Sequence, residues 1–270
     1  MAYSDIWSQI RYLAPYNYIL DSNIVEFDIE KANINVLLYY GAINKTTYDQ
    51  LNALPKMRRE ITVGRMMRRE PNIHSVLKQG IQEARRELFD RLNLDTTNVL
   101  SIKNDAVFVI FTGPVDVDDI QINELVKFKV KGHFRSFYYL SDKEIYYTYN
   151  PITYTEGMDI KGIGDYGLEQ CYGFIRTLSD IFYVCLNNGI KDAYNMATKF
   201  YEDYMTRKFP IDFYRRFDSS AKFDMLPVSK YAGFSADFLD QSAINIIDPS
   251  YNLDLIRQLI SYYTDALLKQ

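Results

Sequence analysis

Hydrophobic residues along the first half of the chain recur with two periods, one typical of strands and one typical of helices. VEFDI at 25–29 is rich in strand formers, and the segment EKANINVLLYYGAI that follows repeats apolar residues at helical spacing. This order predicts a strand and then a helix, with Asp28 at the junction. Further on, Asn72 is the expected N-cap after Pro71, and helical spacing of apolar residues predicts a long helix that ends near Leu92.

Apolar runs of strand length follow this helix. VLSI and AVFVIF, within 99–113, meet at Lys103, Asn104 and Asp105, and a short polar break between such runs is typical of a tight hairpin. Segment 126–140 begins with valine and phenylalanine alternating with lysine, which predicts a strand with one wet face. The run EIYYTYN extends the same sheet.

The second half of the chain is dominated by helical spacing. Glycine concentrates in NPITYTEGMDIKGIGDYG, which is the expected boundary between the two halves. The predicted fold class is α+β, with a mixed or antiparallel sheet and helices followed by a mainly helical half. The expected domains are 1–150 and 168–270, and the second contains helix candidates at 168–186, 190–209 and 252–269.

Composition narrows the class of protein. The chain has 270 residues, is 47% hydrophobic and carries a formal charge of −4, which excludes a wholly disordered chain, a collagen and a disulfide-dense mini-protein. Two isolated cysteines support neither a disulfide framework nor a zinc ribbon. The first residues lack a basic segment leading into an apolar one, and no apolar stretch approaches ~18 residues. We therefore expect a cytoplasmic protein with no membrane partner.

Aromatic usage is skewed. The chain has 24 Tyr and 16 Phe but 1 Trp, together with many residues encoded by A/T-rich codons. This bias is interpreted as an A/T-rich genome placing Tyr, Ile and Asn at tolerant surface positions, and it indicates a viral source, in which case the expected location is the host cytoplasm.

Two acidic residues stand where adjacent strands would present them together. Asp28 ends a predicted strand and Asp105 lies in a predicted hairpin turn. Two carboxylates on neighbouring strands can hold a pair of Mg²⁺ or Mn²⁺ ions, the arrangement that drives nucleotidyl transfer. That chemistry also needs cations facing a triphosphate. The dense basic segment between the two acids supplies Lys56, Arg58, Arg59 and Arg65.

These motifs resemble the palm domain of bacterial DNA polymerase I-type (family A) polymerases. FDIEKANINVLLYYG has the shape of the first palm motif, and the long helix leading into VLSIKNDAVFV resembles the second. PKMRREITVG loosely resembles the fingers helix between them, and the similarity covers roughly 22–112. The resemblance implies metal ligands at Asp28 and Asp105, and partners that are nucleic acid and nucleoside triphosphates. It implies phosphate contacts by the basic segment, with Lys103 beside the primer strand.

Departures from the family pattern leave alternatives open. The family's Glu and Arg in the first motif fall on Asn33 and Asn35, and its His and Glu beside the second Asp fall on Asn104 and Ala106. A catalytically inactive palm-like subunit of a viral replication, transcription or virion complex is therefore one alternative. A purely structural protein is another, because acids at strand ends and turns also serve turn chemistry. The aromatic-rich helices after Leu168 would suit a protein partner.

Overall fold

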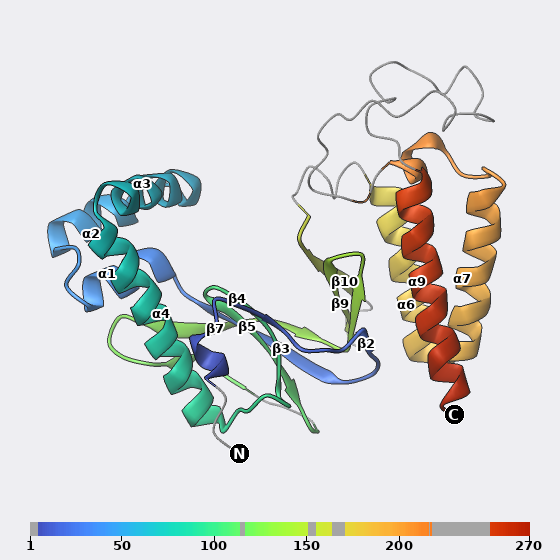
Figure 1. The fold of residues 1–270 in the computed structure, drawn as a ribbon, viewed down its shortest axis with the longest axis horizontal. Coiled ribbons are helices and arrows are strands. Elements are labelled where there is room, and N and C mark those ends of the chain that lie inside the picture. The colour runs from blue at the N-terminus through green and yellow to red at the C-terminus, as the bar shows by residue number, and fades with distance from the viewer. Residues whose placement is uncertain (1–4, 114–116, 151–154, 164–170, 216, 218–248) are drawn as a thin grey trace. The chain divides into compact units, whose positions relative to one another are not determined.

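The structure is a computed structural model that describes residues 5–113, 117–150, 155–163, 171–215, 217 and 249–270 (Figure 1). Contacts divide the chain into a first unit, Met1–Tyr16 with Ser22–His133, and a second unit, Asn17–Asp21 with Phe134–Gln270. Each unit has its own sheet and its own cluster of buried hydrophobic side chains. The α+β class expected from the sequence is confirmed.

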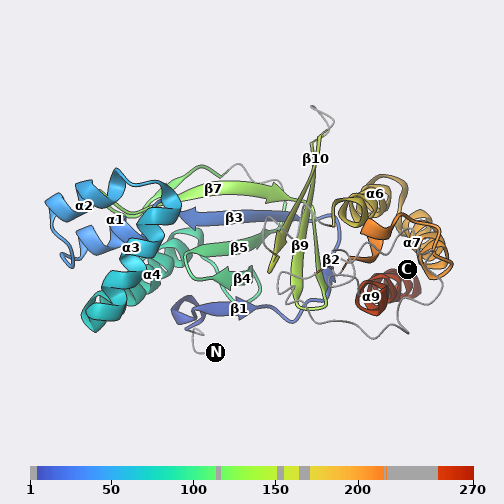
Figure 2. The ribbon, with the colours of Figure 1, turned by 90° about the horizontal axis from the view of Figure 1, so that it is seen from above.

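The sheet of the first unit surrounds the strand that carries Asp28. Its strands are β1 (Arg11–Leu13), β3 (Asn23–Ile29), β4 (Val99–Lys103), β5 (Ala106–Phe111), β6 (Ile120–Gln121) and β7 (Lys127–Phe134). They follow the order β1-β4-β5-β3-β7-β6, and Figure 2 shows β4, β5, β3 and β7 side by side. The strands expected at 25–29, in the hairpin within 99–113 and in the segment where lysine alternates with apolar residues are confirmed. Neither β1 nor β6 was predicted, because each is only two or three residues long.

The hairpin between β4 and β5 forms where it was expected. Lys103 pairs with Ala106, so Asn104 and Asp105 are the two turn residues. Asn104 has a φ of 56°, the left-handed conformation that two-residue hairpin turns require and that Asn tolerates better than most residues. The turn chemistry of the sequence therefore places Asp105 at the end of the sheet.

Four helices lie between β3 and β4 in the chain. They are α1 (Ala32–Tyr39), α2 (Lys45–Asn52), α3 (Lys56–Arg69) and α4 (Pro71–Leu92). Pro55 separates α2 from α3 and is the N-cap of α3. The prediction of Asn72 as the N-cap of the long helix is wrong: Glu70 is the N-cap and Pro71 opens the helix. Proline suits this first helical position because its missing N–H would have had no partner there.

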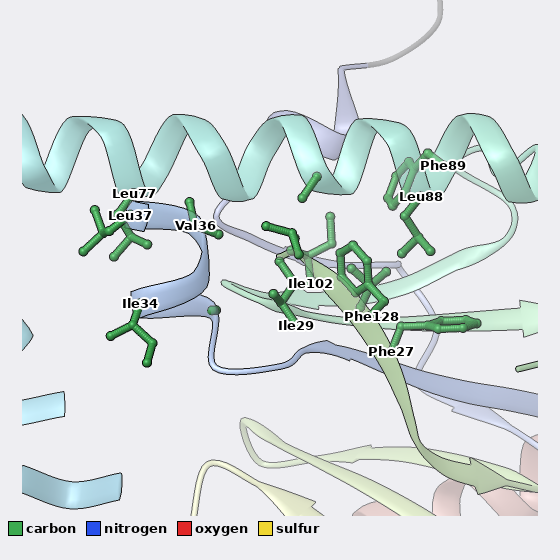
Figure 3. Packing of buried hydrophobic residues seen from close by; sticks show 14 of the residues in the cluster. Phe27, Ile29, Ile34, Val36, Leu37, Leu77, Leu88, Phe89, Ile102 and Phe128 are labelled. Carbon is green, nitrogen blue, oxygen red and sulfur yellow. The ribbon is translucent and has the colours of Figure 1, made fainter. Parts of the chain in front are cut away.

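The core of the first unit lies between the sheet and α4. Val25, Phe27 and Ile29 alternate along β3, and all three are buried in one cluster with Leu77 and Leu88 of α4. Figure 3 shows side chains of the strands facing the long helix, with Val36 and Leu37 of the following short helix beside them. Since successive strand residues point to opposite faces, the side chain of Asp28 lies on the face away from α4.

The second unit has a smaller sheet. Its strands are β2 (Tyr18–Ile19), β8 (Ser136–Leu140), β9 (Lys143–Asn150) and β10 (Thr155–Lys161), in the order β10-β9-β8-β2. The glycine-containing segment that was interpreted as a boundary contains β10, which pairs along its whole length with β9. The first expected domain included β8 and β9, whereas their pairing with β2 and β10 assigns them to the second unit.

Among the described residues, the helices of the second unit lie where the sequence predicts them. They are α6 (Tyr172–Asn188), α7 (Ile190–Met205) and α9 (Pro249–Leu268). A short 3₁₀ helix, Ile211–Tyr214, follows α7. The buried amide of Asn252 joins this segment to α9, accepting from the backbone N–H of Phe217 and donating to the carbonyl oxygen of Phe213.

Aromatic side chains fill the core of the second unit. Tyr138 stacks on Phe182 with ring centroids 4.2 Å apart, and Tyr147 meets the same ring edge-on. Tyr138, Tyr147 and Tyr263 are fully buried. The assignment of the surplus tyrosines to tolerant surface positions is therefore wrong for these residues, because they carry the packing of this unit.

Close approach of α1 and α4 in the first unit depends on a glycine. A Cβ built at Gly80 would lie 2.4 Å from Cγ1 of Val36 and 2.6 Å from the ring of Tyr40. Contacts this short do not occur between real atoms, so the two helices would have to separate. Gly64 of α3 offers a matched comparison, because a Cβ there meets nothing within 4 Å.

We predict that Gly80→Ala and Gly64→Ala change stability in opposite directions. Gly80→Ala should lower the free energy of unfolding by about 1–3 kcal/mol through overpacking. Gly64→Ala should raise it by about 0.5–1 kcal/mol, because alanine favours the helix and no neighbour must move. Denaturant unfolding followed by circular dichroism measures both, and equal effects of the two substitutions would contradict the close packing of α1 on α4.

Candidate functional site

Asp28 and Asp105 meet at the same end of the sheet. In the pairing of β3 with β5, Asp28 is the partner of Ala106, the residue that follows Asp105. The backbone N–H of Ile29 donates to the carbonyl oxygen of Asp105 at 3.2 Å. The structure therefore brings together the two acids that the sequence singled out, one at a strand end and one at the adjacent turn.

The surroundings of Asp105 disfavour its charged form. Burial raises the pKa of Asp105, and the negative charge of Asp28 raises it further. Glu60 on α3 acts in the same direction, whereas Lys131 on β7 lowers the pKa of Asp105. A concentration of negative charge at one end of the sheet is the kind of environment in which functional carboxylates occur.

Lys131 already neutralises part of this charge. Its ammonium group forms an ion pair with the carboxylate of Asp28, whose side chain is 15% exposed while that of Lys131 is 52% exposed. The same sheet face carries a second pair, in which Lys129 lies 2.7 Å from Glu30. The lysines that alternate along β7 are thus placed against Asp28 of β3 and Glu30 directly after it, an arrangement that was not predicted from the sequence.

The two acids are a small donor set for a divalent cation. Within the described residues, no group of three or more His, Cys, Asp or Glu side chains is arranged to hold a metal ion. Carboxylates are the ligands that Mg²⁺ and Mn²⁺ prefer, but Asp28 is in register with Ala106, so the side chains of Asp28 and Asp105 start from opposite faces of the sheet. A shared cation would have to bind at the end of the sheet between the two faces, with water or substrate oxygens completing its coordination. Such binding would require Lys131 to leave Asp28.

The basic residues of α3 lie on two sides of the helix. Arg58 and Arg65 are exposed and, at helical spacing, lie opposite the buried Val63. Lys56 and the half-buried Arg59 lie nearer the Val63 side. Among the described residues, no carboxylate comes within salt-bridge distance of these four cations. The predicted cluster is therefore unneutralised, but its members do not face a single ligand together.

Lys103 is the last residue of β4 and lies directly before the turn that carries Asp105. It is half-buried and pairs in register with Arg11 of β1. Its proposed contact with a primer strand stays a prediction.

A family model matches the chain over nearly its whole length. The family is described as bacteriophage PBS1 gene 130 protein, and the match covers residues 5–264. The chain belongs to this family. No curated protein matches the sequence. The viral source indicated by the composition agrees with membership in a phage protein family, which by itself does not bear on the polymerase-like prediction. In the described parts of this phage protein, no helix combines the length and apolarity needed to cross a bilayer.

Sequence reasoning missed a buried cation next to the acids of this phage protein. Arg85 on α4 is 1% exposed, and Asp105 exerts a favourable electrostatic influence on its guanidinium group. The available signal was its spacing, because Arg85 lies four residues after Ile81 and next to Ala84 on the apolar side of the helix. An arginine at such a position is rarely buried without a specific role.

We predict a pH-dependent stability difference between the wild type and Asp105→Asn. The raised pKa means that the folded protein holds this proton more tightly than the unfolded chain. The resulting stabilisation is complete below the ordinary pKa of 3.8 and is lost as pH rises through the folded-state pKa. Relative to the wild type, Asp105→Asn should therefore gain stability as pH rises through that window.

The measurement is urea unfolding of both proteins at a series of pH values. In an Asp28→Asn background the pH-dependent difference should shrink, because the charge that helps to raise the pKa of Asp105 is gone. A pH-dependent difference of the same size in both backgrounds would show that the two carboxylates are not coupled.

Proposed function

We propose that the first unit is a divergent polymerase-like palm that acts in phage nucleic-acid synthesis by metal-dependent nucleotidyl transfer. The observation that carries the proposal is the meeting of Asp28 and Asp105 at one end of the adjacent strands β3 and β5. Apart from the additional short helix α2, the order of elements supports it: a strand with an acid, a helix, a basic helix, a long helix and a hairpin with an acid. This is the order on which the similarity to the palm of bacterial DNA polymerase I-type enzymes rests.

In this proposal Asp28 and Asp105 would hold Mg²⁺ or Mn²⁺. When bound, the cation would activate a 3′-hydroxyl and stabilise the leaving pyrophosphate. Lys131 would be released from Asp28 and pair with a substrate phosphate instead. Lys56 and Arg59, on the inner side of α3, suit a triphosphate, and the outer residues Arg58 and Arg65 suit backbone phosphates.

A non-catalytic role is the second candidate, and the Lys131 ion pair favours it. An ammonium group on Asp28 satisfies the carboxylate without a metal ion, and no third metal-ligating side chain joins the pair in the described chain. In that case the palm-like unit would be an interaction or assembly subunit of a phage replication, transcription or virion complex in the host cytoplasm. A protein partner would meet exposed aromatic residues such as Tyr172, which is 67% exposed, since most aromatic residues of α6 and α7 are at least partly buried.

We predict that the protein incorporates labelled dNTPs or NTPs on primed or unprimed templates with Mg²⁺ or Mn²⁺. Asp28→Asn and Asp105→Asn should each reduce incorporation by at least about 10²-fold, because each removes a carboxylate needed to hold the cations. Asp49→Asn, an exposed acid on α2, is the matched control and should leave the rate unchanged. No incorporation by a folded wild-type protein would reject the catalytic proposal in favour of the interaction subunit.

We also predict that the outer side of α3 contributes to nucleic-acid binding. The double substitution Arg58→Gln with Arg65→Gln should weaken binding and reduce the slope of log affinity against log salt by about two. Lys45→Gln with Arg86→Gln removes the same charge from exposed side chains that already have acidic partners. Fluorescence anisotropy with labelled single-stranded and duplex DNA, measured over a salt series, compares the pairs. Equal slopes for both double variants would exclude a specific role for this side of α3.

A further inference from the structure

A pocket of about 420 Å³ opens on the α4 side of the first unit. His74, Lys78, Ile81 and Arg85 line it at successive spacings of four, three and four residues, so they form one stripe along α4. Glu60 of α3 and the turn residues Asn104 and Asp105 complete its polar lining. Because the side chain of Asp28 lies on the other face of the sheet, this pocket is separate from the Asp28 carboxylate.

Arg85 is an unusual residue for the floor of a pocket. Its side chain is 1% exposed, and its Nη1 donates to the carbonyl oxygen of Gln9. Its Nε has no hydrogen-bond partner within the described part of the chain. Buried donors in folded proteins nearly always have a partner, so an unpaired guanidinium N–H at a cavity indicates a missing acceptor.

The charge of Arg85 is also incompletely balanced. Burial lowers its pKa to about 10, and the carboxylate of Asp105 opposes this effect. The group is therefore a cation at neutral pH, although no carboxylate of the described residues lies within salt-bridge distance of it. Lys78 lies seven residues earlier on the same stripe, is exposed and likewise has no acidic partner among the described residues. Two cations that no carboxylate of the described chain pairs with, one deep and one at the rim, favour an anionic ligand.

The apolar side chains of the pocket indicate the chemistry of the rest of the ligand. Met67, Leu77 and Ile81 line the same pocket, which has room for more than an inorganic ion. Asn33 and Glu60 could hydrogen-bond hydroxyl or amino groups of such a molecule. We propose that this pocket binds a phosphate monoester through Arg85 and Lys78, with the organic group of the ester against the apolar lining.

This inference goes beyond nucleotidyl transfer and does not rest on it, because the ester binds without a divalent cation and on the α4 side of the sheet. The two proposals also give opposite results for one variant. Asp105→Asn removes a metal ligand, which would abolish transfer. The same change removes a negative charge beside Arg85, which would strengthen binding of an anion in the pocket.

Isothermal titration calorimetry of the full chain in EDTA tests the site with three probes: inorganic phosphate, phenyl phosphate and AMP. We expect saturable binding, tighter for the two esters than for inorganic phosphate. Lys78→Gln should weaken ester binding about fivefold or more, and Asp105→Asn should tighten it. Lys45→Gln changes an exposed lysine of the same unit that does not line the pocket, and it should have no effect.

Arg85→Gln should abolish binding, but it alters a buried residue that could be needed for folding, so the exposed Lys78 carries the test. Absence of saturable binding by all three probes to folded wild-type protein would overturn the proposal. Equal affinities of Lys78→Gln and Lys45→Gln, or weaker binding by Asp105→Asn, would overturn it as well. If the protein binds esters in EDTA but incorporates no nucleotides, the phosphate-ester site is supported and the catalytic proposal is rejected.

Discussion

Pairing of β3 with β5 is the constraint on which the first unit depends. The register that sets Asp28 opposite Ala106 also points Val25, Phe27 and Ile29 toward α4. A slip of one residue would turn these apolar side chains away from the helix and bring Asp28 into the core. Burial of the β3 side chains against α4 and the meeting of the two acids are therefore consequences of one register. The site cannot be rearranged without cost to the core.

Local patterns in the sequence were sufficient to predict the strands and helices that take part in this pairing and its core. The strand of Asp28, the helix after it, the hairpin of Asp105 and the long helix were all predicted because each has an unbroken period and clear turn residues. Their joint order then predicted that a strand-end acid and a turn acid would meet. That step needed only the rule that successive elements separated by a helical crossover return to the same sheet.

What could not be predicted depends on contacts distant in sequence. The three-residue β1 is a strand only because it pairs with β4, and β10 lies within the glycine-containing segment that was interpreted as a boundary. The ion pair between Lys131 and Asp28 joins strands separated by four helices and a hairpin. Burial of Arg85 was not predicted because arginine is a charged residue. A helical pattern identifies the apolar side of a helix but not which polar residue is buried beside that side. The buried tyrosines of the second unit were wrongly assigned to the surface, because codon bias does not indicate which residues are buried.

Asp105 connects the two proposed sites through charge alone. Lys131 lowers its pKa, Asp28 raises it, and Arg85 on α4 is influenced by its carboxylate. A divalent cation held by Asp28 and Asp105 would favour the ionised form of Asp105, but it would also bring two positive charges to the end of the sheet, which would favour a phosphate group beside Arg85 electrostatically. Since coupling between two ligands is reciprocal, an ester in the pocket would strengthen binding of the cation to the same extent. Cooperation of this kind requires no movement of the backbone, only a cation and an anion bound on either side of one carboxylate at the end of the sheet.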